Sequence, residues 1–462
     1  MWPFKSKPEP KKRNYDSASR SNRLSGWNTY GTDANASNQS LSVIRNRSRD
    51  LVRNNPHAAR IVQAISSHVV GFGITGAIKG NKKLDDVWQQ WAESRQCDAD
   101  GRHDFYGLQR LVMRCVVESG ECLIRLRYRR PEDGLIVPLQ LQVLEPDYLD
   151  SNKSGPLPNG GQIINGIEYD PIGRIVAYWL YKNHPGAAVG TMTFTSSRID
   201  ADSVIHVFRL DRPGQSRGIP WLSPIMVKLR ELDIYQDAVL KRQQLANMFA
   251  GYVYDDVPGD AIDEIAEELP ELEPGTVYAL KNGRRIEFSE PPNVTPNEFV
   301  RETLRDIAAG IGITYESLTQ DLSQVNFSSA RMGANEMLRN VDQWQWQMLI
   351  PLLCEKVGQA FINTALQSGM SANRVRFEWT PPAKTLVDPT REIPAIIKSV
   401  RAGLMSYQEA LRAQGMNPDK VMKEIAESNA MLDKFKIILD SDPRVDQNLT
   451  PQQVANNDTT NT

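Results

Sequence analysis

The sequence has little cysteine, little histidine and no long apolar run. Only four of its 462 residues are cysteine and five are histidine. The cysteines show no paired spacing, which favours reduced thiols in a cytosolic compartment over a disulfide framework. No run of about 18 apolar residues occurs, so we expect no membrane-spanning helix. The N-terminal MWPFKSKPEPKKR is charged and broken by proline, and it lacks the apolar centre of a secretory signal.

An excess of charge of one sign is also missing. The chain has 54 Lys and Arg against 56 Asp and Glu, a formal net charge of −2. This balance excludes a basic protein that coats nucleic acid, and any contact with DNA must depend on locally placed cations. Hydrophobic residues make up 40% and charged residues 24% of the chain, as in ordinary folded proteins. The length predicts about two to four domains or subdomains.

Motifs for nucleotide chemistry are almost absent. The segment GFGITG (71–76) matches the G-x-G-x-x-G pattern, but the residues before it have the pattern of a helix end rather than of a strand. We therefore favour a glycine-rich turn and keep a nucleotide-handling enzyme as an alternative that rests on this motif alone. No Walker A lysine loop is present, which excludes the chain from the DNA-motor ATPases.

Candidate metal and catalytic residues are equally sparse. The loose group Cys97, His103, Cys115 and Cys122 matches no zinc spacing, so packed core residues are the simpler interpretation. His206 lies within a strand pattern and is predicted to pack there. The sequence contains no serine-nucleophile or paired-histidine motif. We predict no catalytic residue, no metal site and no cofactor.

The N-terminal half is predicted to be α+β. Residues 1–39 are rich in Lys, Arg, Ser and Asn and indicate a flexible arm. Helices follow, the first capped by Ser40 and the second started by Asn55-Pro56. Arginines at 45–53 lie beside the first apolar stripe; a solvated face or a subunit contact is favoured over nucleic acid. From about 121 apolar and polar residues alternate with a period of two. This pattern predicts one antiparallel sheet of about six strands, with an Asn165-Gly166 hairpin.

The C-terminal half is predicted to be mainly helical. Ser223-Pro224 starts a long helix that nothing interrupts before Gly251, and 252–295 has a strand-and-turn pattern. A helix over about 296–312 leads into a polar segment, and Pro351 predicts a kink in the next long helix. Trp344 and Trp346 are predicted to be packing residues of that helix. A strand at RVRFEWT and three helices from Asp388 to about Ile438 complete the folded chain.

The segment DLSQVNFSSARMGANEMLR (321–339) combines many hydrogen-bonding side chains with little charge. Ahead of Arg339 its one cation is Arg331, which lies at the start of the helix predicted from about Ala330. The segment has no catalytic motif and no general base within reach by sequence, so an active-site loop is not favoured. Its composition alone indicates a polar linker between two packed helices.

Several blocks, in order, resemble the lambda-type portal proteins of tailed bacteriophages. The resemblance covers about 40–370. It rests on RNNPHAARIVQAISSHVVGFGI, LQRLVMRCVVESGECLIRL, LQLQVLEPDYLD, GIEYDPIGRIVAYWLY, HVFRLDRPGQSRGIPWLSP, LEPGTVYALKNG and IGITYESLTQDLSQVNFSSARMGANE.

The resemblance implies a portal fold with an α+β wing, a helical stem, a small clip and a helical crown. Carried onto this chain it gives an arm (1–39), the wing (40–220), stem helix 1 (221–251), the clip (252–295), stem helix 2 (296–315), a tunnel loop (316–329), a kinked helix returning to the wing (330–387), the crown (388–440) and a disordered tail (441–462). The second stem helix is shorter than the first, which leaves the clip boundaries open.

The implied function is a non-enzymatic ring at one capsid vertex, dodecameric in this family, through which DNA is packaged and ejected. The implied partners are double-stranded DNA, the terminase large subunit, a head–tail connector, and the major capsid and scaffold proteins. The implied location is the virion, and the host cytoplasm during assembly. Expected DNA-facing residues are Gln320, Ser323, Gln324, Asn326, Ser328, Ser329 and Arg331; stem-surface residues are Lys228, Arg230, Lys241 and Arg242; and clip contacts are Lys281, Arg284 and Arg285.

A second alternative is an oligomeric scaffold without a DNA pore, such as a connector or a minor capsid component. Because head-to-tail contacts that close under rotation give a ring, electron microscopy of the pure protein separates this alternative from a portal with a central channel.

Overall fold

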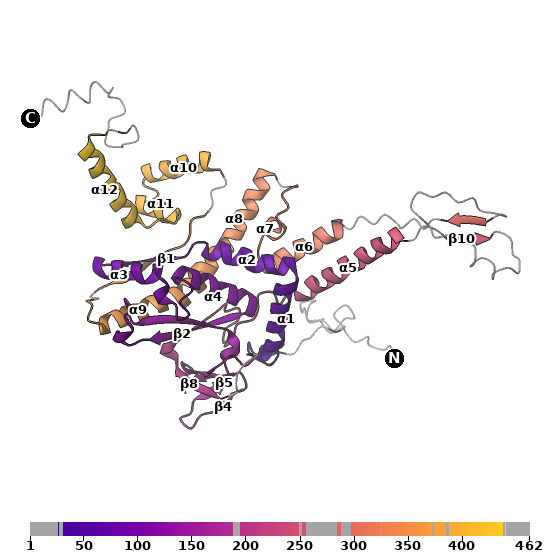
Figure 1. Ribbon diagram of the computed structural model, residues 1–462, viewed down its shortest axis with the longest axis horizontal. Helices are drawn as coiled ribbons and strands as arrows, with labels where there is room; N and C mark the ends of the chain where they lie inside the picture. The colour runs from indigo at the N-terminus through magenta and orange to yellow at the C-terminus, as the bar shows by residue number, and fades with distance from the viewer. Residues whose placement is uncertain are drawn as a thin grey trace, which may run out of the picture.

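The computed structural model describes residues 26, 31–187, 195–248, 252–255, 284–287, 297–324, 326–371, 374–384, 388–437 and 439. Helices and antiparallel strands are both present there, which confirms the α+β class. Figure 1 shows a central body of helices and sheets, two helices that project from one side of it, and a group of C-terminal helices above it. No helix among the described residues is long and apolar enough to cross a membrane.

Four helices form one layer of the body: α1 (Leu41–Asn54), α2 (Pro56–Val70), α3 (Lys82–Glu93) and α4 (Phe105–Ser119). The predicted start of α2 is confirmed, since the side chain of Asn55 accepts the backbone N–H of Ala58 at 2.8 Å. Ser40 stands at the predicted N-cap of α1 but makes no capping hydrogen bond.

The last part of the predicted flexible arm is folded. The short 3-10 helix η3 (Ala36–Ser40) precedes α1. The Asn35 side chain accepts the backbone N–H of Ser216 at 2.9 Å and donates to the carbonyl of Gly214 at 3.0 Å. The prediction of a free arm over 1–39 is therefore wrong for residues 31–39, because these hydrogen bonds join them to a segment far along the chain. Residues 1–25 and 27–30 lie outside the described part.

The strands form two main sheets rather than the single sheet predicted. One sheet has the order β3-β2-β9, and the other runs β4-β5-β6-β7-β8. The bounds are β2 (Glu121–Tyr128), β3 (Leu139–Leu144), β4 (Gly155–Pro156), β5 (Gln162–Ile164), β6 (Ile167–Tyr169), β7 (Ile175–Tyr181), β8 (Ser196–Asp200) and β9 (Val204–Phe208).

The division has a clear packing cause. Leu123 of β2 and Val204 of β9 bury one face of the first sheet against Ile167 and Leu180 of the second. Cys122 and Ile124 on the opposite face of β2 pack on the helices, so this strand carries apolar side chains on both faces. The predicted hairpin is confirmed, because Asn165 and Gly166 link β5 to β6 with φ values of 49° and 83°.

The glycine-rich motif is a turn from a helix into a strand. It joins the end of α2 to β1 (Thr75–Lys79), which pairs with β12 (Arg376–Thr380). The dinucleotide fingerprint needs a strand before the turn and a helix after it, and here the order is reversed. Gly71 and Gly73 have φ values of 53° and 124°, and the Phe72 side chain between them is fully exposed. The turn interpretation is confirmed.

An aromatic cluster marks the centre of the core. The Trp88 ring lies 5.3 Å from Trp91 and 5.0 Å from Phe361, measured between ring centroids. Both tryptophan N–H groups donate to backbone carbonyls, at 2.9 Å to Gly76 and 3.0 Å to Leu139. Because both indole N–H groups are hydrogen-bonded, the two rings can be fully buried without leaving an unpaired polar group.

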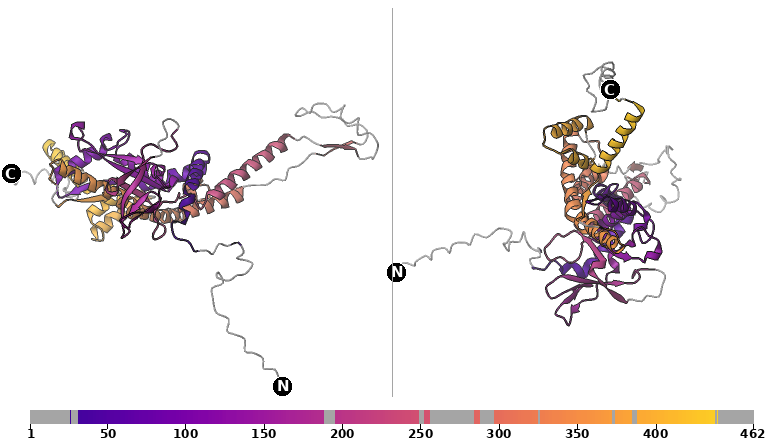
Figure 2. Two further views of the ribbon diagram at one scale, coloured as in Figure 1. Left: turned by 90° about the horizontal axis from the view of Figure 1, so that it is seen from below. Right: turned by 90° about the vertical axis from the view of Figure 1, so that its left-hand side faces the viewer.

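The long helices differ in detail from the predicted ranges. They are α5 (Met226–Met248), α6 (Asn297–Ile311), α7 (Tyr315–Thr319), α8 (Phe327–Trp344), the π-helix η8 (Gln345–Cys354) and α9 (Glu355–Gln367). Helix α5 starts later than Ser223-Pro224, because the Ser223 hydroxyl donates to the carbonyl of Pro220 at 2.6 Å and so takes part in a preceding turn. Figure 2 shows α5 extending well away from the body.

The interruption expected at Pro351 is present as the π-helical segment η8. Proline lacks the N–H that a regular helix uses, so a wider turn accommodates it. Trp344 is buried and packs on Trp221 with ring centroids 4.9 Å apart, as predicted. Trp346 is 54% exposed, so the packing prediction is wrong for that residue.

The C-terminal helices are α10 (Pro389–Arg401), α11 (Tyr407–Ala413) and α12 (Pro418–Phe435), close to the predicted ranges. Ion pairs join them to the β1–β12 pair, because Lys79 contacts Asp419 and Glu378 pairs with Arg412 at 3.1 Å. At the far end of α5, β10 (Tyr252–Asp255) pairs with β11 (Arg284–Glu287) (Figure 1). The rest of the predicted clip lies outside the described residues.

We predict that Gly73→Ala destabilises the fold far more than Gly101→Ala. Both glycines have positive φ values, but a Cβ at position 73 would lie 2.4–2.6 Å from the Tyr106 side chain, whereas at position 101 it meets nothing within 4 Å. The strained backbone costs about 1–2 kcal/mol in each case, and the overlap adds about 1–3 kcal/mol at position 73. Urea unfolding of both variants measures the difference, and equal losses would contradict it.

Candidate functional site

The carboxylate of Glu121 lies fully buried at the start of β2. Two buried guanidinium groups contact it: Arg217 at 2.5 Å and Arg45 at 2.9 Å, both to Oε1. Oε2 lies 3.0 Å from the Nε2 atom of His206 and accepts the backbone N–H of Gly218 at 2.8 Å. One carboxylate thus joins α1, β2, β9 and the connection that leads to α5.

The network keeps this carboxylate ionised. Burial alone would raise the pKa of Glu121, but the Arg217 charge and the hydrogen bonds from His206 and Arg217 hold the pKa well below its usual value. Burial lowers the pKa of Arg45, while Glu121 and Asp147 act in the opposite direction. A buried charge is tolerated when its partners and hydrogen bonds are complete, and here several donors share the two oxygens.

This finding corrects the prediction of a solvated face for Arg45 and Arg49, whereas Arg47 and Arg53 are exposed as predicted. Arg45 is buried rather than solvated, and Arg49 forms an ion pair with Asp147 at 2.6 Å. No residue pattern near these arginines indicates their partners, which lie far along the chain. His206 is packed within its strand as predicted, and it also contacts Glu121.

Potential metal ligands gather in one place among the described residues: Glu145, Asp147 and His184. Arg45 and Arg49 already pair with Asp147, and Arg49 also pairs with Glu145 at 3.2 Å. The group is therefore an ion-pair cluster at the edge of the Glu121 network. Cys97, Cys115 and Cys122 are free thiols and do not form a ligand set of three with His103.

The connection from Arg217 fixes the root of α5. Arg217 also donates to Ser151 Oγ at 3.0 Å, which ties the second sheet to the network. A few residues on, the backbone N–H of Trp221 donates to the carbonyl of Val117 at 3.1 Å. Asn55, the cap of α2, donates to Asp233 Oδ1 on α5 at 2.7 Å. The projecting helix is thus held by hydrogen bonds from α4 and α2.

Helices α5 and α6 form a pair that leaves the body together (Figure 1). Lys228 of α5 pairs with Asp306 of α6 at 2.7 Å, and the rings of Tyr235 and Phe299 lie 4.9 Å apart. The predicted stem-surface residues Arg230, Lys241 and Arg242 are exposed on α5, and Lys228 is half exposed in its ion pair.

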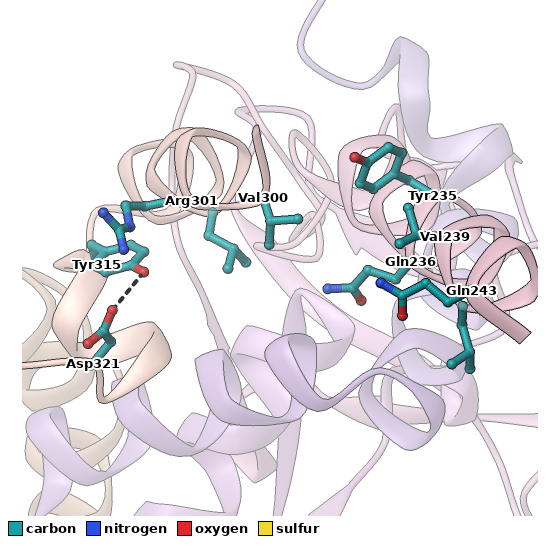
Figure 3. A pocket seen from close by; sticks show the side chains of 10 residues that line it. Tyr235, Gln236, Val239, Gln243, Val300, Arg301, Tyr315 and Asp321 are labelled. Atoms are coloured by element: carbon teal, nitrogen blue, oxygen red, sulfur yellow. Dashed lines mark hydrogen bonds between the residues drawn. The ribbon is translucent and has the colours of Figure 1, made fainter. Parts of the chain in front are cut away.

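A cleft of about 490 Å³ lies between α5, α6 and the start of the α7–α8 connection. Figure 3 shows Gln236 and Gln243 from α5 on one side and Arg301, Tyr315 and Asp321 on the other. The Tyr315 hydroxyl donates to Asp321 Oδ2 at 3.4 Å. The lining is mixed in polarity and contains no nucleophile next to a base, so it offers no catalytic arrangement.

The connection predicted as a loop over 316–329 is shorter in the structure. Thr314 caps α7 by accepting the backbone N–H of Ser317 at 3.1 Å, and Asn326 caps α8 by accepting that of Ser329 at 2.8 Å. The non-helical part is therefore about 320–326, of which 325 lies outside the described residues. Helix α8 also starts earlier than the predicted Ala330 because of this cap.

Much of the polar character of this connection serves local structure. Asn326 and Ser329 form the cap, and the hydroxyl and backbone N–H of Ser323 hydrogen-bond to Asp321, which lowers the pKa of Asp321. Gln320 and Gln324 are exposed and make no side-chain hydrogen bond to described residues. The side chain of Ser328 lies outside the described part. That these residues face DNA stays a prediction.

Arg331 contacts the C-terminal helices. Its guanidinium lies 3.4 Å from Glu392 of α10, and it is 44% exposed. Arg331, the cation of the predicted DNA-facing set, is thus half exposed, and the carboxylate of Glu392 partly neutralises its charge. Of the predicted clip contacts, Lys281 lies outside the described residues, and Arg284 and Arg285 stand on β11 opposite Asp255 and Tyr254.

Comparison with known proteins gives one family match and several relatives. The family model for the lambda family of phage portal proteins matches residues 20–345. The probable portal protein of Halomonas phage phiHAP-1 is 28% identical over 83% of this chain and 79% of its own length. Portal protein B of Escherichia phage lambda is 22% identical over 80% of each chain, and the portal protein of Escherichia phage N15 is 22% identical over 85% of each.

Two solved structures that match this chain are the neck of a particle and a portal protein. The neck of an empty gene transfer agent particle, computed with C6 symmetry, matches with a TM-score of 0.48 and 15% identity over 80% of this chain and 94% of that one. An HK97-family phage portal protein from Corynebacterium diphtheriae matches with a TM-score of 0.36 and 11% identity over 76% and 98%.

We predict that Glu121→Gln costs about 3–5 kcal/mol of unfolding free energy at neutral pH, because it leaves the buried Arg217 without its counter-charge and Arg45 with Asp147 alone. The native pKa of Glu121 is depressed, so its contribution is complete above the unfolded-state value of about 4.5 and disappears as the pH falls through the native value. The difference between wild type and variant should therefore be constant from pH 8 to about pH 5 and shrink at lower pH.

Glu145→Gln serves as the matched control, because Glu145 is a mostly exposed member of the same cluster. An exposed ion pair contributes about 0–1 kcal/mol, so this variant should unfold close to wild type. Denaturant unfolding at a series of pH values checks both. A small effect of Glu121→Gln, or a difference that grows below pH 4, would contradict the ion-pair account.

Proposed function

Since this chain belongs to the lambda family of phage portal proteins, we propose that its copies form a dodecameric ring at one capsid vertex, with the DNA channel on the ring axis. The protein is a portal for DNA packaging and ejection, it is not an enzyme, and its place is in the virion. In the proposed ring, α5 and α6 are the stem, β10 and β11 belong to the clip, the body is the wing, and α10–α12 are the crown.

The observation that carries the channel assignment is the α7–α8 connection. It is polar, it carries the exposed amides of Gln320 and Gln324, which make no hydrogen bond to described residues, and the nearby cation Arg331 forms an ion pair with Glu392. In a ring every such group is repeated around the axis. Hydrogen-bonding amides then contact phosphates without the salt-dependent affinity that many free cations produce. The near-zero net charge of the chain fits a channel through which DNA moves.

The partners follow from the proposed placement. The clip end of α5 and α6, with Arg284 and Arg285 on β11, faces the terminase large subunit during packaging and the head–tail connector afterwards. The wing and crown meet the major capsid and scaffold proteins. Assembly takes place in the host cytoplasm. The stem pair held by Lys228 and Asp306 separates the clip from the body.

We predict that Gln320→Glu combined with Gln324→Glu lowers the amount of packaged DNA by about tenfold or more. Added carboxylates, repeated in every subunit, repel the phosphates at the narrowest proposed part of the channel. Packaged DNA is measured as nuclease-resistant genome per assembled particle in a phage complemented with the variant. Neither glutamine hydrogen-bonds to described residues, so the fold should be retained.

Gln90→Glu combined with Gln367→Glu is the matched control, because it adds the same charge at exposed positions on α3 and α9. It should package normally. Electron microscopy of the wild type and both variants reports ring formation. Rings with normal packaging by the loop variant would refute the channel assignment alone, whereas a wild type without rings would refute the proposed assembly.

A further inference from the structure

Three arginines form a ladder along one face of β2 and the residue after it: Arg125, Arg127 and Arg129, here called the arginine ladder. Alternate residues of a strand point to the same face and repeat at about 6.6 Å. The first two are half-buried and the third is exposed. The ladder therefore presents three cations in a line of about 13 Å.

Neutral side chains of β3 hold the ladder in place. Gln142 Oε1 accepts the Nε–H of Arg127 at 2.8 Å, and Gln140 Oε1 accepts that of Arg129 at 2.7 Å. Gln140 is itself fixed, because its Nε2 donates to two backbone carbonyls of the turn at 96–98, both at 3.1 Å. These amides orient the guanidinium groups of Arg127 and Arg129 without neutralising them, and the terminal nitrogens of these two groups make no hydrogen bond to other described residues.

No carboxylate among the described residues forms an ion pair with the arginine ladder. Two acidic groups lie close to neighbouring residues. Asp133 accepts the backbone N–H of Arg130 at 3.1 Å. Asp202 is close enough to Tyr128 to help raise the pKa of that phenol, after the larger effect of burial. The remaining arginine in the strands of the two sheets, Arg198, differs in this respect, since it pairs with Glu168 at 3.1 Å.

The ladder consequently carries uncompensated repulsion. Burial, followed by the charges of Arg125 and Arg129, lowers the pKa of Arg127. Like charges about 6.6 Å apart on one face of a strand repel each other, and here the neighbouring strand supplies amides rather than carboxylates. A surface built in this way is stabilised when an anion binds to it.

We propose that the arginine ladder binds an extended acidic segment of a partner protein, in which carboxylates at alternate positions meet successive arginines. An extended chain repeats its side chains on one face at the same spacing as the strand beneath it. Free guanidinium edges match carboxylates in paired hydrogen bonds. The inference goes beyond the proposed function, because it assigns a protein-recognition surface that has no part in the DNA path.

Duplex DNA fits this surface less well. Proteins that bind duplex DNA tightly neutralise about 6–10 phosphates, and the ladder offers three cations on a chain of net charge −2. Figure 1 also places β2 in the lower layer of the body, away from α7 and the start of α8, where the channel is proposed. A short acidic peptide segment needs no more cations than the ladder provides.

The test uses the full chain and two fluorescent peptides of equal composition. In one peptide glutamate and threonine alternate, and in the other the glutamates form a single block. We expect the alternating peptide to bind about tenfold more tightly by fluorescence anisotropy, and the variant Arg125→Gln/Arg127→Gln/Arg129→Gln to lose about tenfold in affinity for it. Arg125 makes no side-chain hydrogen bond to described residues, so Arg125→Gln alone should keep the fold and lose part of the affinity.

The matched control is Arg47→Gln/Arg339→Gln/Arg401→Gln, which removes the same charge from exposed positions outside the ladder. It should bind the alternating peptide like wild type. Equal binding of both peptides, or equal loss in the control and ladder variants, would overturn the proposal. So would a ladder variant that loses affinity for a fluorescent DNA duplex while keeping its affinity for the peptide, since that result assigns the ladder to nucleic acid. None of these readouts depends on ring formation.

Discussion

The burial of one carboxylate, that of Glu121, constrains the arrangement of the whole body. A fully buried carboxylate persists only where its charge and its lone pairs are satisfied. Arg45 from α1, Arg217 from the connection before α5, His206 from β9 and the backbone of Gly218 supply those contacts. None of these segments can move away without leaving a buried charge unpaired, so the helical layer, both sheets and the root of α5 share a single junction.

That junction has a direct consequence for the portal. The projecting pair of α5 and α6 is useful in a ring only if it leaves every subunit at the same angle. Arg217 and Trp221 fix the chain just before α5, and Asn55 holds Asp233 within its first turns. Helix α7, which leads into the polar α7–α8 connection, is held on the other side, where Arg60 donates to the carbonyl of Ser317 at 2.9 Å. A rigid body would thus present both the proposed stem and the proposed channel loop in a fixed relation.

Local signals made much of the fold predictable. Asn55-Pro56, Asn165-Gly166 and the helix-then-strand order around Gly71 each act within a few residues, so the sequence alone indicates the element and its start.

Contacts between residues far apart in the sequence could not be predicted. Nothing near Arg45 distinguishes an arginine that pairs with a buried Glu121 from one on a solvated face. The same limit explains the two sheets, which separate because Leu123 faces Ile167 and Leu180. Asn326 was assigned to a loop because a helix cap and a polar loop residue look alike until the next helix is seen. The family and function were within reach because many blocks occur in order; the residues that face DNA were not.

The central claim is that Glu121 and Arg217 act as one unit, and a double-mutant cycle tests it most directly. Glu121→Gln, Arg217→Met and the double variant are compared with wild type by denaturant unfolding at neutral pH. The account predicts that the two single variants are each strongly destabilised and that the double variant recovers about 2–3 kcal/mol of the summed loss, since it leaves neither partner charge unpaired across that contact. Additive losses, with a coupling energy below about 0.5 kcal/mol, would contradict the claim.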